Sequence, residues 1–148
     1  RSDGFHQHYG RENLIRNNIF AFGREFQVMR TREEGHLSFT FTHNIVYFDS
    51  GELLGSNWSN NNFAMDHNIY WDARLARDPS SLGFKGATLE RWRARGHDLN
   101  SVVADPLFAA PTEGDFRLKA NSPALAGGFQ PIDIATVGIR PKSARPNP

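Results

Sequence analysis

The sequence contains no cysteine, which excludes a disulfide framework and any zinc site with thiolate ligands. It also has no apolar run near the ~20 residues that a membrane-spanning helix needs, and no charged-then-apolar segment at its start. We therefore expect no membrane partner. Cysteine usage alone does not distinguish an exported bacterial protein from a cytosolic one.

An excess of charge of either sign is also missing. Lys and Arg together number 17 and Asp and Glu number 16, so the formal net charge is +1. A surface that binds a polyanion through bulk electrostatics needs a strong basic excess, and nucleic acid is therefore not an expected partner. The sequence is 39% hydrophobic and 12% aromatic, which is enough to build the core of one domain.

A short motif recurs three times: Asn-Ile followed by an aromatic residue one or two places later. The motif asparagines are Asn18, Asn44 and Asn68, so the spacings are 26 (44 − 18) and 24 (68 − 44) residues. Such a period is close to one turn of a parallel β-helix. Asparagine tolerates the left-handed backbone of a tight corner, and stacked asparagines can hydrogen-bond from coil to coil. The repeat predicts that each coil turns a corner at its Asn.

Three short strands are expected in each coil, which makes three parallel sheets. One strand precedes the Asn corner, a second follows it, and a third lies earlier in the coil. The pattern predicts an all-β fold, a right-handed parallel β-helix of about three to four coils, with a β-sandwich as the alternative. The strands before the corners are expected within 13–16, 37–42 and 63–66, and the earlier strands within 4–9, 26–32 and 52–58.

The pattern changes after the coils, which we place at about 4–72. A helix capped by Thr88 and ended by Gly96 is expected in an excursion over about 84–97. Final strands and a cap are expected over about 101–138, in which Ser122-Pro123 indicates a turn. The interpretation is one domain over 1–138, followed by a Pro- and Arg-rich tail over 139–148.

Six features of the sequence carry a family resemblance: Gly4–Gly10, the three Asn-Ile corners, Gly96–Asp98, Ala104–Phe108, Asp115–Leu118 and Ser122–Ala124. Together they resemble the C-terminal region of bacterial pectate-lyase-like β-helix proteins. This resemblance implies a secreted or periplasmic, carbohydrate-active protein, similar to glycoside hydrolases that act on plant cell-wall or related polysaccharides.

The chain begins without Met and enters patterned residues at once, as expected for a piece of a longer protein. The first coil of such a piece exposes unpaired strand hydrogen-bonding groups. We therefore expect a homo-oligomer that forms through the N-terminal coils.

Two histidines near the start of the chain are candidate substrate contacts. His6 and His8 alternate with Gln7 on a predicted strand, so both are expected on the face opposite Phe5 and Gln7. Imidazoles at this spacing suit acid–base chemistry, substrate contact or half of a metal site. Hydrogen bonding to neighbouring loops is the alternative, and no motif with specific metal-site spacing is present.

Charged residues gather directly after the second early strand. Arg30 and Arg32 suit a carboxylated sugar, and Glu33 and Glu34 are candidates for the acidic pair of a glycosidase. Asp49 completes the catalytic candidates. The alternative is a solvated salt-bridge cluster. Two further carboxylates that we consider are Glu52 and Asp72.

Trp58 is a candidate platform for sugar stacking, because its apolar face fits the C–H face of a pyranose. Otherwise it packs under the turn at 60–62. His43 and His67 precede corner asparagines and are interpreted as turn residues, and Trp92 as a packing group.

Three functions remain open. The first is a glycoside hydrolase with its acidic pair among Glu33, Glu34 and Asp49. The second is a polysaccharide lyase, in which Arg30 or Arg32 neutralises a uronate, often with Ca²⁺, although the sequence shows no Asp cluster suited to that ion. The third is a non-catalytic module that binds glycan or caps a solenoid. No other cofactor is expected.

Overall fold

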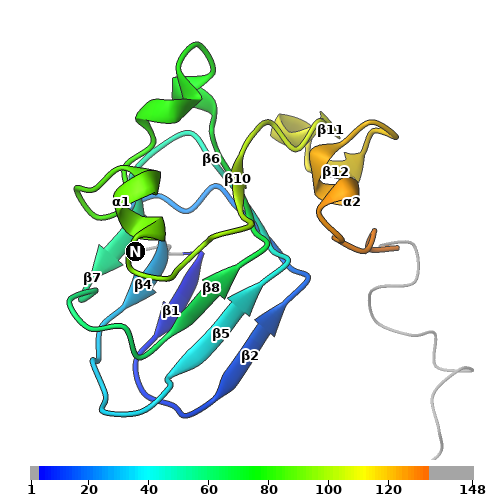
Figure 1. Ribbon diagram of the computed structural model, residues 1–148. Coiled ribbons are helices and arrows are strands. Elements are labelled where there is room, and N and C mark those ends of the chain that lie inside the picture. The colour runs from blue at the N-terminus through cyan, green and yellow to red at the C-terminus, as the bar shows by residue number, and fades with distance from the viewer. Residues whose placement is uncertain (1–3, 134–148) are drawn as a thin grey trace, which may run out of the picture.

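The computed structural model describes residues 4–133, which form a parallel β-helix with a short helical excursion (Figure 1). Each of three coils contributes one strand to each of three sheets, and all pairings within these sheets are parallel. The β-sandwich alternative is thereby excluded. Among residues 4–133 no helix is long and apolar enough to cross a bilayer.

We call the sheets A, B and C in the order in which a coil enters them. Their strands stack in parallel, one coil on the next. Sheet A contains β1 (Phe5–Gln7), β4 (Phe26–Arg30) and β7 (Glu52–Ser56); sheet B contains β2 (Asn13–Arg16), β5 (Phe39–Thr42) and β8 (Ala64–Asp66); sheet C contains β3 (Ile19–Ala21), β6 (Ile45–Phe48), β9 (Ile69–Asp72) and β10 (Val102–Val103).

The corner between sheets B and C is built as the repeat predicts. The Asn44 side-chain oxygen accepts hydrogen bonds from the backbone and side-chain nitrogens of Asn18, and Asn68 does the same for Asn44. The left-handed backbone, however, falls one residue earlier than predicted: at His43, for example, φ is 53°. His43 and His67 stack their rings in parallel, 4.9 Å apart.

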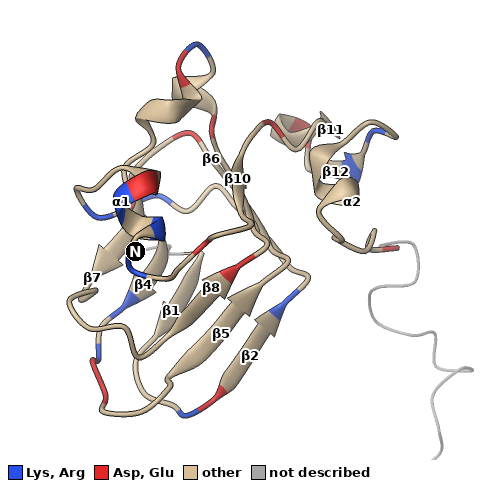
Figure 2. Ribbon diagram, viewed as in Figure 1, with Lys and Arg blue, Asp and Glu red and all other residues tan. Residues whose placement is uncertain are grey.

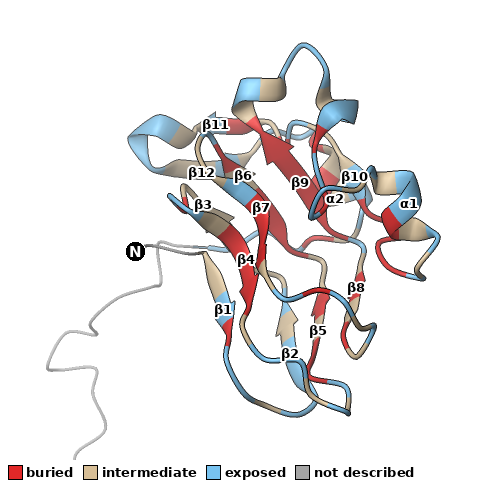
Figure 3. Ribbon diagram, turned by 90° about the vertical axis from the view of Figure 1, so that its left-hand side faces the viewer, coloured by how far each residue is buried: buried red, intermediate tan, exposed pale blue. Residues whose placement is uncertain are grey.

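Aromatic side chains fill the space enclosed by the sheets. Phe39 stacks on Phe63 of the next coil at 6.0 Å, and Phe63 stacks on Trp92 at 5.7 Å. The first coil is less buried than the second and third, as Figure 3 shows for β2 and β3 against β5, β6 and β9. Burial of these rings supplies the main stabilisation, because each aromatic side chain removes a large apolar area from water.

The helical excursion covers one end of this stack of aromatic side chains. Thr88 caps α1 (Leu89–Arg93) through its hydroxyl, and Gly96 follows with a φ of 92°, as predicted. Trp92 on this helix is fully buried, which confirms its packing role. Before α1 the chain forms two 3-10 turns, η1 (Ala73–Leu75) and η2 (Pro79–Ser81).

The final segment folds back along the outside of sheet C. Phe108 and Phe129 pack against Ile45 and Ile69 there. Ser122 begins a helix rather than only a turn, because its side chain accepts a hydrogen bond from the Ala124 backbone. The tail predicted at 139–148 lies outside the described residues. The elements are β11 (Phe108–Ala110), η3 (Pro111–Glu113), β12 (Asp115–Leu118), antiparallel to β11, and α2 (Pro123–Ala126).

Candidate functional site

Two exposed histidines converge on one hydroxyl at the open edge of sheet A. The Thr31 Oγ1 atom lies 3.0 Å from His6 Nε2 and 3.0 Å from His8 Nδ1. Gln7 between them is only 3% exposed, which confirms that both histidines occupy the opposite, outward face. We call His6, His8, Tyr9, Thr31 and Arg32 the histidine cluster.

The hydrogen bonds of Thr31 determine which imidazole nitrogens carry protons. Its hydroxyl donates to the Gln7 carbonyl oxygen at 3.1 Å, which uses its only proton. It then accepts from His6 Nε2–H and His8 Nδ1–H. In the neutral rings, His6 Nδ1 and His8 Nε2 are consequently left with free lone pairs for an incoming ligand.

Tyr9 and Arg32 form the second part of the cluster. The Arg32 guanidinium carbon lies 5.1 Å from the centre of the Tyr9 ring, and the His8 ring meets the same tyrosine edge-on at 4.6 Å. Tyr9 is 63% exposed, a large value for an aromatic residue. Within residues 4–133 Arg32 has no carboxylate partner, so its N–H groups are available to a ligand.

Glu34 fixes the loop that carries Tyr9. Its Oε2 accepts hydrogen bonds from the Gly10 backbone at 3.2 Å and from Gln7 Nε2 at 3.3 Å. His36 Nε2 lies 3.7 Å from Oε1, and the Glu34 side chain is 20% exposed. Glu34 is thus the one predicted catalytic carboxylate that contacts residues of the loop bearing the histidine cluster.

The Glu33 carboxylate is hydrogen-bonded to the loop of the next coil. Its carboxylate accepts from the Ser59 backbone and from the Ser59 hydroxyl, each at 2.6 Å, and from the Asn60 backbone at 3.3 Å. The bond from the Ser59 hydroxyl is the main reason that the pKa of Glu33 lies below its usual value. A general acid needs the opposite shift. The lowered pKa does not suit Glu33 as the acid of the predicted pair, and its hydrogen bonds give it a loop-bridging role.

Replacing Glu33 by Gln tests this correction. We expect a loss of about 1–2 kcal/mol in the free energy of unfolding, because charge-assisted hydrogen bonds to Ser59 and Asn60 are lost. Urea unfolding followed by far-ultraviolet circular dichroism measures it, with Glu12→Gln as a control, because the Glu12 side chain is 67% exposed. Unchanged stability would contradict the bridging role.

Arg30 does not reach the surface, contrary to the expectation that it binds substrate. Its side chain is 0% exposed. It donates to Asn60 Oδ1 at 2.9 Å, lies 3.7 Å from Glu33 Oε1 and sits 5.1 Å from the centre of the Phe63 ring. Burial lowers the pKa of the guanidinium. Arg30 holds the loops together from inside.

Trp58 is also inside, so the expected sugar platform at this position is wrong. The residue is 4% exposed, and its indole N–H donates to the Gly55 carbonyl at 2.7 Å. Its ring packs against Phe63 at 4.9 Å and Trp92 at 5.8 Å. Trp58 is therefore a packing residue of the core.

The structure does not bring the three predicted catalytic carboxylates together. Glu33 and Glu34 lie in the loop from β4 to β5, whereas Asp49 is exposed in the turn from β6 to β7, at another corner of the coil. Figure 2 shows acidic and basic positions mixed over the coils rather than gathered by sign. Glu52 and Asp72 instead line a separate cavity of about 500 Å³ beside the excursion.

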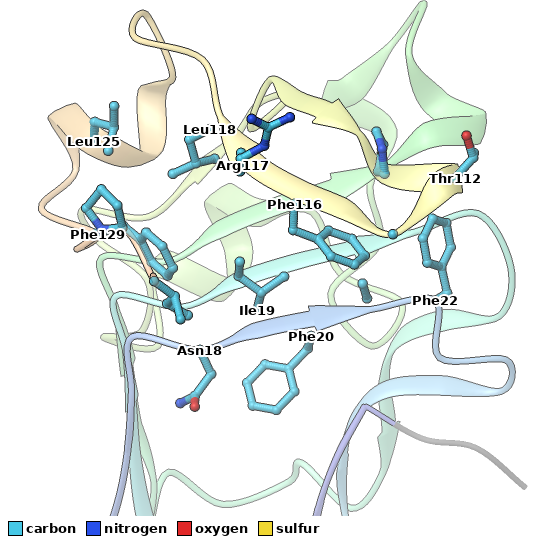
Figure 4. Close-up of a pocket in the computed structure, with 15 residues that line it drawn as sticks. Asn18, Ile19, Phe20, Phe22, Thr112, Phe116, Arg117, Leu118, Leu125 and Phe129 are labelled. Atoms are coloured by element: carbon cyan, nitrogen blue, oxygen red, sulfur yellow. The ribbon is translucent and has the colours of Figure 1, made fainter. Parts of the chain in front are cut away.

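A further cavity in the described part of the chain holds none of the predicted site residues. It has a volume of about 940 Å³ and lies between β3 and the final hairpin with α2 (Figure 4). Its lining is mainly apolar, from residues such as Ile19, Phe22, Phe116 and Phe129. Nowhere in 4–133 do three or more His, Asp or Glu side chains gather in a way that could hold a metal ion.

Sequence reasoning missed Thr31 and Tyr9. A usable signal existed for Thr31, because the β1–β4 register pairs Gln7 with Arg30 and so places Thr31 beside His8. Stacking the coils by their period would have found this pair. Tyr9 had no such signal, since its neighbours come from loops.

Comparison of the chain with protein-family models, curated proteins and solved structures gave no significant match.

Proposed function

We propose that this chain is a carbohydrate-active β-helix that hydrolyses glycosidic bonds of a plant cell-wall or related polysaccharide, with the histidine cluster in contact with the sugar. The observation that carries the proposal is the pair of outward imidazoles bound to one hydroxyl beside an exposed tyrosine. Ring nitrogens with free lone pairs accept hydrogen bonds from sugar hydroxyls or from water. A location outside the cytoplasm and self-association through the first coil belong to the same proposal.

The proposed acid–base chemistry follows from which groups of the site can donate or accept a proton. Hydrolysis of a glycosidic bond needs one group that protonates the leaving oxygen and one that activates water or attacks the sugar. His8 offers a base through Nε2, since Nδ1 donates to Thr31. Glu34 is the carboxylate that we propose as the second group; it bonds to Gly10 and to the side chain of Gln7, which lies on the face of β1 opposite the histidines.

The direct test is mass spectrometry of products after incubation of the purified chain with xylan, pectin and β-glucan. Hydrolysis adds one water per bond cleaved, and such products would support the proposal. The absence of products from every glycan would contradict catalysis and favour a binding or capping module.

Replacing both His6 and His8 by Ala should lower the initial rate of product release about tenfold or more, because base and hydroxyl contacts are lost together. Both residues are exposed, so the free energy of unfolding should change by less than about 1 kcal/mol. Lys119→Ala, at an exposed position beyond β12, is the matched control and should keep the full rate. An unchanged rate in the double variant would remove the histidine cluster from the mechanism.

A polysaccharide lyase is the second candidate, favoured by one observation. Arg32 stacks on Tyr9 and has no acidic partner among the residues that the structure describes. A free guanidinium can neutralise the carboxylate of a uronate while a base such as His8 removes the adjacent proton. Unsaturated products from pectin, without added water, would replace the hydrolase proposal by this one.

A further inference from the structure

An apolar groove runs along the first coil, between β3 and the final hairpin. It is the cavity of about 940 Å³, and Figure 4 shows it extending from Leu125 and Phe129 at one end to Phe22 and Thr112 at the other. Phe22 and Phe116 in its walls are only half-buried, so the groove presents apolar surface that an occupant can cover. We call it the β3 groove.

One side of the β3 groove is the free edge of a sheet. β3 pairs with β6, and no strand among residues 4–133 pairs with its other side. The Asn18 carbonyl and the Phe22 amide both bond toward β6, each at 2.9 Å. Because backbone groups alternate in direction along a strand, the N–H and C=O groups of Ile19 and Ala21 point away from β6. Such an edge can pair with another extended segment.

The apolar surface and the free edge belong to one site. Ile19 packs with the outer apolar cluster and Phe20 with the core, and both residues line the groove. A groove that reaches both faces of a strand must pass over its edge. The β3 groove therefore fits an extended segment with apolar side chains.

The chain itself reaches this groove near its C-terminal end. Gln130 is joined to Asn17 by two hydrogen bonds: its backbone N–H donates to Asn17 Oδ1 at 2.7 Å, and its carbonyl accepts from Asn17 Nδ2 at 2.9 Å. Pro131 and Ile132 then line the groove, and Ile132 is 43% exposed. Since Asn17 directly precedes the corner before β3, the chain enters the groove where β3 begins.

The sequence that follows suits the groove. Residues 134–139 read Ile-Ala-Thr-Val-Gly-Ile, with no charged side chain and four β-branched residues, which favour extended pairing. At roughly 3.3 Å per residue, six extended residues reach about 20 Å, whereas the three residues of β3 span about 10 Å. The segment is thus long enough to follow the whole edge. From Arg140 the sequence becomes basic and Pro-rich, which does not suit an apolar groove.

We propose that segment 134–139 lies extended in the β3 groove of the same chain and pairs with the free edge of β3. Its apolar side chains then cover Phe22 and Phe116, and the backbone groups of Ile19 and Ala21 gain partners. The contact closes the edge of sheet C to a second copy, while the edges of β1 and β2 stay available for the proposed self-association. The proposal does not depend on a carbohydrate function.

Amide hydrogen exchange of the full chain, followed by NMR, tests the pairing. The Ile19 and Ala21 amides should be protected from exchange. The combined variant Val137→Asp and Ile139→Asp should speed their exchange at least tenfold, because a charged segment is costly to bury in an apolar groove. The amide of Val46, a fully buried residue of β6, is the internal reference and should keep its rate.

Ser143→Asp combined with Ala144→Asp is the matched control. It adds the same two negative charges beyond the segment, within the basic, Pro-rich stretch. We expect Ile19 and Ala21 to exchange in this variant as in the wild type. Equal acceleration in the two variants would overturn the proposal, as would unprotected Ile19 and Ala21 amides in the wild-type chain.

Dilution distinguishes a contact within one chain from a contact between copies. Intramolecular pairing does not depend on protein concentration, so the protection of Ile19 should persist over about a hundredfold dilution. Protection that is lost on dilution would assign the groove to a second copy and overturn the proposal. Because no glycan enters this experiment, a failure of the hydrolase proposal leaves its outcome unchanged.

Discussion

Replacing Asp98 by Ala should destabilise the fold by about 3–5 kcal/mol, because several buried donors would lose their common acceptor. Asp98 is 0% exposed. One carboxylate oxygen accepts from Tyr70 at 2.9 Å and from Asn68 at 3.3 Å, and the other accepts from the Trp92 indole at 2.8 Å. Ser101 donates to the first oxygen as well. The residue thus joins the asparagine ladder to α1.

Denaturant unfolding followed by far-ultraviolet circular dichroism measures this loss, since Trp92 fluorescence would itself respond to the substitution. Asp105→Ala is the matched control: it is exposed, and its carboxylate accepts one backbone hydrogen bond, from Leu107. We expect the control to lose no more than about 1 kcal/mol. Equal losses in the two variants would show that the Asp98 network contributes little.

Acidification from pH 6.5 to 4 should cost up to about 3 kcal/mol of stability through His97 alone. Burial, with Arg95 and Arg30 nearby, lowers its pKa from 6.5 to about 4. The ring is 4% exposed and stacks on Phe63 at 4.1 Å. Between the two pKa values the unfolded chain binds a proton that the folded chain does not, so stability is present above pH 6.5 and is lost as the pH falls.

His97→Gln removes this titration and retains a donor for Asn61, which His97 Nε2 contacts at 3.1 Å. The variant should show a flatter dependence of unfolding free energy on pH over the same window. His43, whose pKa burial also lowers, adds to the slope in both proteins. Asp98 acts in the opposite direction, because burial raises its pKa and its ionisation above pH 3.8 opposes folding. Identical slopes in variant and wild type would contradict the assignment to His97.

The coil pattern was predictable because it repeats along the sequence. The spacing of Asn18, Asn44 and Asn68 identified the corners, and alternation around Gln7 placed His6 and His8 on one face. These features depend on residues close in sequence or one period apart. The prediction that the corner asparagine itself is left-handed was wrong by one residue, since either position satisfies the same turn pattern.

Arg30 and Trp58 were placed wrongly for a different physical reason. Charged and amphipathic residues at strand ends usually face water, and sequence offers no sign of the loops that cover them. Asn60 provides the partner that lets Arg30 be buried, and Trp92 from α1 packs against Trp58. Burial of a polar group depends on such distant partners.

The sequence by itself therefore determined the solenoid, its corners and the outward face of the two histidines, because local alternation and a constant period specify them. Only the tertiary structure decided which carboxylates meet and which polar groups are buried. It separated Asp49 from Glu33, and it gathered Asn68, Trp92 and Ser101 around Asp98. Those contacts join loops and a helix that no period relates, so their geometry arises only when the coils stack.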